Sequence, residues 1–143
     1  MQTFAQLIDD HEGLAIEAKR LIALVSQQES HAAQAYDQLC KFRNQLDTHL
    51  YAEADFIYAD EMRKDPSRLE TEIIAFEQEF ADLKADWGDY LTEWSEDNIA
   101  SDWAEFAGVT ARMMGRLLER IAAENAVLYP LALQHGRIRL RAA

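Results

Sequence analysis

Two stretches of the sequence, "HLYAEADFIYA" (residues 49–59) and "RIAAENAVLYP" (residues 120–130), are near copies of each other and decide the expected fold. Each copy places an ionisable residue four positions before a glutamate, and a tyrosine follows. Residues four positions apart lie on the same face of an α-helix. Each copy therefore predicts a helix with a polar pair on one face. The aligned pairs are His49 and Arg120, Glu53 and Glu124, and Tyr58 and Tyr129.

Signals for helix starts and stops divide the chain into four helical segments. Thr3 with Gln6, and Ser67 with Glu70, form capping-box patterns that predict helix starts. Pro66 predicts a stop, because proline cannot continue a helix. The expected helices cover residues 3–26, 30–64, 67–94 and 98–136.

Each segment carries a seam of mainly apolar residues at intervals of three or four, and such a seam must be buried. In the last segment the seam passes through Arg120 and Glu124 to Val127 and Leu131, with Pro130 expected to kink or shorten the helix. Short connections join the segments. The pattern predicts an all-α, antiparallel, up-down-up-down four-helix bundle.

The chain length sets the expected domain organisation. The 143 residues are enough for one domain with its own core. We expect the bundle to occupy residues 1–136 and a short basic tail to occupy residues 137–143. The tail could pair with the acidic body or with another subunit, or it could be mobile.

The composition limits the classes of partner and the compartment. With a net charge of −12 and a pI of about 4.6, the chain should repel nucleic acid and anionic membranes. No apolar run approaches the ~20 residues of a membrane span, and the N-terminus lacks the basic and apolar regions of a signal peptide. The single cysteine, Cys40, fits a reducing compartment. We therefore expect a cytoplasmic protein with neither a nucleic-acid partner nor a membrane partner.

Five ionisable residues stand inside the seams, where folded proteins avoid such groups unless they are paired or bind a metal. Chain reversal in the bundle should bring them together at one end. Two histidines and two glutamates suit a first-row metal such as iron, manganese or zinc. The five residues are His11, His49, Glu53, Arg120 and Glu124.

Three segments, in this order, resemble the hemerythrin-like (HHE cation-binding) family. They are "DHEGLAIEAKRLIAL" (residues 10–24), "LCKFRNQLDTHLYAEADFIYA" (residues 39–59) and "LLERIAAENAVLYPLA" (residues 117–132). The resemblance implies a four-helix bundle with a di-iron centre inside it. It also implies that four residues match ligand positions of the family, namely His11, His49, Glu53 and Glu124.

The sequence departs from the family pattern at two ligand positions. Arg120 stands where the family has a histidine on the fourth helix, and residues 67–94 contain no histidine for the third helix to supply. Arginine only donates hydrogen bonds, so it cannot ligate a metal. It can instead pair with Glu124, and with Glu53 across the bundle. The alternatives are a metal-free site closed by this ion pair, and a mononuclear site on the remaining ligands.

The repeated tyrosines, Tyr58 and Tyr129, lie close to these candidate ligands in sequence. They could orient the ligands by donating hydrogen bonds to them. They could also simply pack at the edge of the bundle, as tyrosines in helical proteins often do.

The resemblance and the departures support three classes of function. The first is a non-catalytic protein that binds or senses metal, oxygen or nitric oxide. The second is a metal-free bundle that acts as an interaction or regulatory module, with a homodimer or another protein as partner. The third is a metal-dependent oxidase or peroxidase, which ranks last because no nucleophile–base pair or phosphate-binding loop stands out in the sequence.

Overall fold

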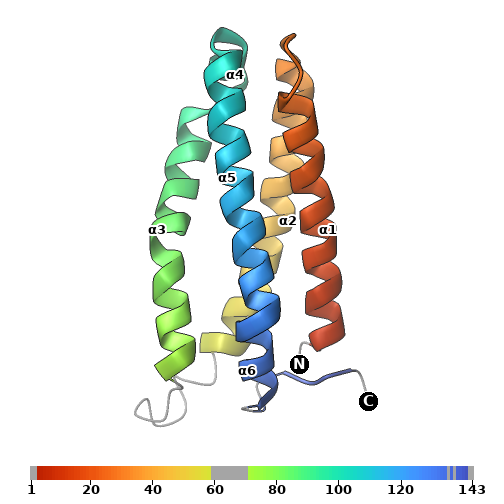
Figure 1. Cartoon of the computed structure of the whole chain (residues 1–143), viewed down its shortest axis with the longest axis vertical. Helices are drawn as coiled ribbons and strands as arrows, with labels where there is room; N and C mark the ends of the chain where they lie inside the picture. Colours follow the sequence, from red (N-terminus) through yellow and green to blue (C-terminus); the bar gives the residue numbers. More distant parts are fainter. Residues whose placement is uncertain (1–2, 59–70, 135, 137, 142–143) are drawn as a thin grey trace.

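A computed structural model describes residues 3–58, 71–134, 136 and 138–141 of the chain, except for the side chains of residues 55–58. Figure 1 shows the long helices side by side, running alternately up and down. The predicted all-α, antiparallel four-helix bundle is therefore confirmed. The helices are α1 (Phe4–Val25), α2 (Ala32–Tyr58), α3 (Thr71–Glu93), α4 (Glu96–Ser101), α5 (Trp103–Ala123), the π-helix η2 (Glu124–Leu128) and α6 (Tyr129–Gln134).

The first helix begins where its capping pattern predicts. The Gln6 backbone N–H donates to Thr3 Oγ1 at 3.1 Å, and the Thr3 N–H donates to Gln6 Oε1 at 3.0 Å. Each bond satisfies a backbone donor that the first helical turn leaves without a partner, and such a cap stabilises a helix by about 1 kcal/mol. The Ser67–Glu70 pattern and the Pro66 stop lie outside the described residues.

The last predicted helix is not continuous, which corrects the expectation of one helix over residues 98–136. Its chain breaks at Asp102, whose backbone is not helical (φ −145°, ψ 66°). The Asp102 side chain accepts from the Glu105 N–H at 3.4 Å and so caps the start of α5. Aspartate favours such caps over helix interiors, because its carboxylate competes for backbone donors.

A second irregularity lies just before Pro130, where α5 passes into the π-helix η2. The Tyr129 N–H bonds to the carbonyl of Glu124, five residues back instead of four. In an α-helix the ring of Pro130 would clash with the carbonyl four residues earlier. Widening the turn relieves that clash, so the kink predicted at Pro130 takes the form of a π-turn.

The π-turn moves the buried seam by one position. The prediction that Val127 and Leu131 face inward was therefore wrong. Val127 is 44% exposed and Leu131 is only partly buried. A wide turn adds one residue, so every later side chain shifts relative to an α-helical count. The residues buried in their place are Leu128, Tyr129 and Ala132.

The bundle has two apolar cores, and a polar group of side chains lies between them. The main core fills most of the length of α1, α2, α3 and α5. A smaller end core lies near the chain ends and comprises Leu7, Ile73, Phe76, Leu128, Tyr129, Ala132 and Ile138. Along α1 the order is Leu7 in the end core, then His11, then Leu14 in the main core. The polar seam residues thus separate the two cores.

Part of the C-terminal segment packs against the bundle. Ile138 is buried in the end core, and the carbonyl of Arg139 accepts from the Phe4 N–H at 2.6 Å. Both described chain ends therefore meet at the same end of the molecule (Figure 1). None of the described helices combines the length and apolar character that crossing a membrane requires.

Candidate metal centre

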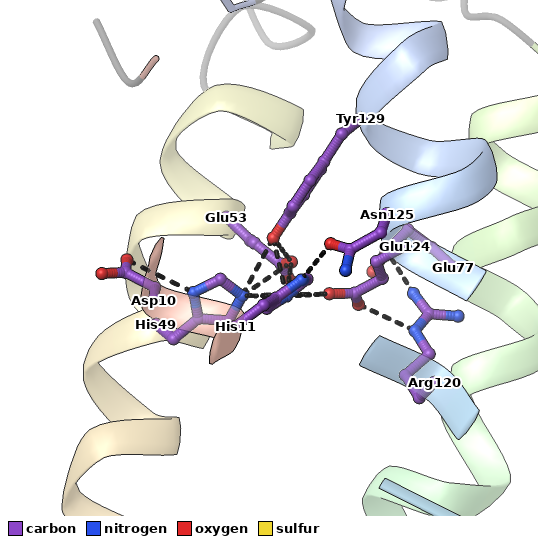
Figure 2. A network of polar contacts seen from close by, with 9 residues as sticks. All are labelled: Asp10, His11, His49, Glu53, Glu77, Arg120, Glu124, Asn125 and Tyr129. Atoms are coloured by element: carbon purple, nitrogen blue, oxygen red, sulfur yellow. Dashed lines mark hydrogen bonds and ion pairs between the residues drawn. The ribbon is translucent and has the colours of Figure 1, made fainter. Parts of the chain in front are cut away.

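Four of the predicted site residues converge between the two cores. Helix α1 contributes His11, α2 contributes His49 and Glu53 one turn apart, and η2 contributes Glu124. Each of the four is at most 4% exposed. One potential ligand atom from each residue lies within 4.8 Å of the others. We call these four residues the His–Glu cluster (Figure 2).

The two imidazoles point the same ring atom at a common centre. His11 Nε2 lies 2.8 Å from His49 Nε2. It also lies 2.9 Å from Glu124 Oε1, and His49 Nε2 lies 3.0 Å from Glu53 Oε1. Each Nε2 therefore adjoins both the other ring and a carboxylate oxygen.

The other nitrogen of each imidazole faces an oxygen. His11 Nδ1 donates to Asn125 Oδ1 at 2.6 Å. His49 Nδ1 is buried and, within the described part of the chain, has no hydrogen-bond partner, although Asp10 Oδ2 lies 3.5 Å away. Histidines that bind metal through Nε2 are usually oriented by an oxygen at Nδ1. The bond to Asn125 therefore sets His11 to offer Nε2 as a ligand atom, and the Asp10 carboxylate lies on the Nδ1 side of His49.

Asn125 and Asp10 were not predicted as site residues. Each is the sequence neighbour of a predicted ligand, namely Glu124 and His11. Polar residues beside a seam are common on solvated helix faces, so the spacing pattern gives no signal that separates these two from the rest.

The structure places the hydroxyl of Tyr129 at the His–Glu cluster. The hydroxyl donates to Glu53 Oε1 at 2.8 Å and lies 2.8 Å from His11 Nε2 and 3.1 Å from His49 Nε2. Figure 2 shows the tyrosine reaching the cluster from α6. The side chain of Tyr58, the other predicted tyrosine, lies outside the described residues.

Arg120 stands beside the cluster and links two carboxylates. Its Nε donates to Glu124 Oε2 at 2.8 Å, its Nη1 to the Phe76 carbonyl at 2.9 Å and its Nη2 to Glu77 Oε1 at 3.0 Å. The predicted pairing with Glu124 is thus present. The second carboxylate that Arg120 contacts belongs to Glu77 on α3, and not to Glu53 as predicted.

The third helix receives the guanidinium with aromatic rings. The Cζ atom of Arg120 lies 4.0 Å from the centre of the Phe76 ring and 4.5 Å from that of Phe80. A cation over an aromatic face is attracted to the electrons of the ring. Helix α3 therefore holds the Arg120 guanidinium with two aromatic rings and a backbone carbonyl.

The cluster favours protonated imidazoles and a charged Glu124 carboxylate when no metal is bound. Burial lowers the pKa of His49, but hydrogen bonds to Glu124 and Glu53 outweigh burial and raise the pKa to about 10. The pKa of His11 is also raised, because its bonds to Glu124, Glu53 and Asn125 outweigh burial. Burial raises the pKa of Glu124, yet hydrogen bonds from its neighbours and the charge of Arg120 hold it well below its usual range.

Two cavities adjoin the cluster. One of about 10 Å³ is lined by polar residues that include His11 and Arg120 and by apolar residues that include Leu46, Phe80 and Leu117. This volume suits about one water-sized molecule. The second, of about 420 Å³, lies between α1 and α2 and is lined by Asp9, Asp10, Gly13, Leu14, Asn44, Gln45, Thr48 and His49. It brings an acidic opening up to the edge of the cluster.

The donor set suits a metal ion. Two imidazole nitrogens and two carboxylate oxygens are ligands that iron, manganese and zinc share. Their burial, their convergence and the oriented Nδ1 atoms fit a bound cation. The His–Glu cluster could therefore hold a metal.

A sequence model of the family described as the Hemerythrin HHE cation binding domain matches residues 3–132. The matched range contains the whole His–Glu cluster and Arg120. No curated protein and no solved structure shows significant similarity to the chain.

Proposed function

The chain belongs to the hemerythrin HHE cation-binding family, and we propose that it is a non-catalytic protein that binds one metal ion, with iron as the expected metal. The ligands would be His11, His49, Glu53 and Glu124. The observation that carries the proposal is their convergence within 4.8 Å, with an oxygen facing the Nδ1 atom of each histidine.

Arg120 is the reason for proposing one ion where the family resemblance implies two. Its guanidinium stays protonated and contacts Glu124 Oε2 at 2.8 Å. A second cation next to this fixed charge would be repelled, and more strongly in a buried site than in water. Phe76 and Phe80, which pack against Arg120, offer no metal ligand.

The charges of the site also balance for one divalent ion. Glu53 and Glu124 together carry two negative charges, which one divalent cation neutralises. Glu77 contacts Arg120 at 3.0 Å and can balance the guanidinium. With neutral imidazoles the whole group then carries no net charge, as a buried site requires.

The small volume of the cavity beside the cluster supports a sensing role rather than catalysis on an organic substrate. It adjoins His11, His49 and Glu124 and has space for about one water-sized molecule. A diatomic molecule such as oxygen or nitric oxide is the largest ligand that we expect there. The apolar lining on its other side would favour such an uncharged guest over an ion.

A metal-free bundle is the second candidate, and a specific observation favours it. The ligand atoms already bond to one another and to Tyr129, and the raised pKa values of both histidines favour bound protons. Protons on His11 and His49 could then balance the carboxylates in place of an ion. The function would in that case lie on the bundle surface, as an interaction module.

Metal analysis of protein expressed with added iron tests both candidates. We expect about one iron per chain, and far less in a variant with His49→Ala and Glu53→Ala. The matched control is Glu17→Gln, because Glu17 is also buried between α1 and α2 but is held by Gln38 and Arg20, away from the cluster. A folded protein without metal would favour the second candidate. Two irons per chain would contradict the argument from Arg120.

A further inference from the structure

We propose that Tyr129 is a fifth ligand of the metal ion and binds it through the phenol oxygen, an inference that rests on the proposed metal site. The oxygen lies 2.8 Å from His11 Nε2, 3.1 Å from His49 Nε2 and 2.8 Å from Glu53 Oε1. Ligands at bond lengths of about 2.1 Å are spaced about 3 Å apart around one ion. The phenol oxygen therefore has the spacing of another ligand atom.

The π-turn is what brings this oxygen to the site. In an α-helix the residue four positions after Glu124 would lie above it, and that residue is Leu128. The bond from the Tyr129 N–H to the Glu124 carbonyl places the fifth residue there instead. Glu124 and Tyr129 consequently share one face and reach the same site, from a type of turn that is frequent at functional sites.

Packing fixes the direction of the tyrosine. Its ring stacks on His11 with centroids 4.9 Å apart and meets the edge of Phe4 at 6.3 Å. The side chain is fully buried. A tyrosine that only needed to satisfy its hydroxyl could do so with the one bond to Glu53. Here the same oxygen also adjoins both imidazole Nε2 atoms, so it is directed at the centre of the cluster.

The chemistry of a phenol ligand favours the ferric state. On coordination the phenol proton leaves to solvent, and the resulting phenolate adds a third negative charge to those of Glu53 and Glu124. Three negative charges balance Fe³⁺, whereas two balance Fe²⁺. Tyrosinate is an established ligand of iron in proteins. Electron density passing from phenolate to Fe³⁺ gives a visible absorption band that carboxylate and imidazole ligands do not produce.

The test is to load the protein with ferric nitrilotriacetate and to measure iron per chain, visible absorption and resonance Raman spectra. We expect the unaltered chain to bind iron with a visible band and tyrosinate ring modes. Tyr129→Phe should still bind iron through four ligands but should lose the band. The matched control is Tyr90→Phe, which removes a buried hydroxyl that bonds Thr110 in the main core, and it should keep the band.

The outcomes separate this inference from the proposed function. Iron binding by the unaltered chain without a visible band, or a band that survives Tyr129→Phe, overturns the tyrosine ligand but leaves the metal site standing. Failure of the unaltered chain to bind ferric or ferrous iron overturns both. If Tyr129→Phe does not fold, ring-deuterated tyrosine in a Tyr58→Phe background replaces it. Raman bands that shift on deuteration then support the inference, and unshifted bands overturn it.

Discussion

Arg120 donates to acceptors on two different helices and lies between the rings of Phe76 and Phe80 and the carboxylate of Glu124. Removing its side chain would therefore affect charge and packing together. Its guanidinium also provides a positive charge that stays in place whether or not a metal is bound.

Arg120→Ala should destabilise the metal-free protein by about 3–5 kcal/mol, because it leaves the buried Oε2 atom of Glu124 without its charged donor. Urea unfolding in the presence of a chelator measures the loss. The matched control is Arg116→Ala, since Arg116 pairs with Asp86 at the same 2.8 Å but both side chains are about half exposed. That pair should contribute less than about 1 kcal/mol. Equal losses in the two variants would contradict the role given to Arg120.

The stability of the metal-free protein should depend on pH through His49. Its pKa is about 10 in the folded state against 6.5 in the unfolded chain, so only the folded state holds the proton between these values. The contribution of His49 to the free energy of unfolding should therefore be fully present below pH 6.5 and should be lost as the pH rises from 6.5 towards 10. Urea unfolding across this range, with chelator present, measures the slope. His49→Gln should make it shallower, and an unchanged slope would assign the proton to another group.

The contribution of Glu124 to stability changes with pH in the opposite direction. Its pKa is held well below the usual range in the folded protein. Its contribution to stability is present above its unfolded pKa, near 4.5, and is lost as the pH falls through its folded value. The metal-free protein should consequently be most stable at pH values above those at which Glu124 binds a proton and below those at which His49 releases one.

At the scale of the helices, the sequence predicts most of the buried faces up to Glu124. Regular spacing identifies His11, His49 and Glu53 as inward residues, because α-helical geometry alone relates spacing to a face. The predicted buried face is wrong from Val127 onward. The spacing of three and four residues assumes an α-helix, and it gives no sign of the π-helical hydrogen bond from Tyr129 to Glu124. Pro130 is the one local signal, and it predicts a distortion without saying which kind.

Two further polar contacts in the bundle could not be found from spacing. Glu17 is buried outside the predicted seam, where Gln38 and Arg20 satisfy its carboxylate. Glu77 becomes a partner only once the bundle brings α3 beside Arg120. Such contacts depend on tertiary packing, which the order of residues in one helix does not contain.

The π-turn can be tested by shortening the chain at Ala126, which is exposed. A π-turn is an α-helix with one extra residue, so deleting Ala126 should restore an α-turn and keep Tyr129 above Glu124. Pro130→Ala is added to remove the clash that would oppose this α-turn. The double variant should unfold cooperatively and keep nearly the stability of Pro130→Ala alone, as measured by urea unfolding.

The matched control deletes Ala122, which is also exposed but lies within α5. This deletion rotates the following residues by about 100° and turns the end-core side chains away from their neighbours. Each lost apolar burial should cost about 1.5–3 kcal/mol. If both deletions were equally harmful, the wide turn would not be a simple one-residue insertion.

At the scale of the whole molecule, the His–Glu cluster interrupts what would otherwise be one continuous apolar core. Burying these groups costs free energy unless hydrogen bonds, protons or a metal ion compensate them. Bonds from Asn125, Tyr129 and Arg120 supply part of that compensation. The further partners of this layer are the Phe76 carbonyl and Glu77 on α3, which bond Arg120, and Asn125 on η2, which bonds His11.

Metal and protons should therefore compete for the His–Glu cluster. A metal ion needs neutral imidazoles, whereas His49 holds a proton at neutral pH in the metal-free protein. Binding of ferrous ion should release at least about one proton per ion and should weaken as the pH falls. Anaerobic calorimetry in buffers of different ionisation enthalpy measures the proton release.

The same binding should raise the free energy of unfolding, by about 2.7 kcal/mol at a free metal concentration one hundred times Kd. At a fixed free metal concentration the gain should be smaller at pH 6 than at pH 8, because His49 is protonated at both pH values and a higher proton concentration competes more strongly with the metal. Urea unfolding with and without metal at the two pH values checks this. Metal that binds without releasing protons and without stabilising the fold would bind outside the layer, for instance at the acidic opening lined by Asp9 and Asp10.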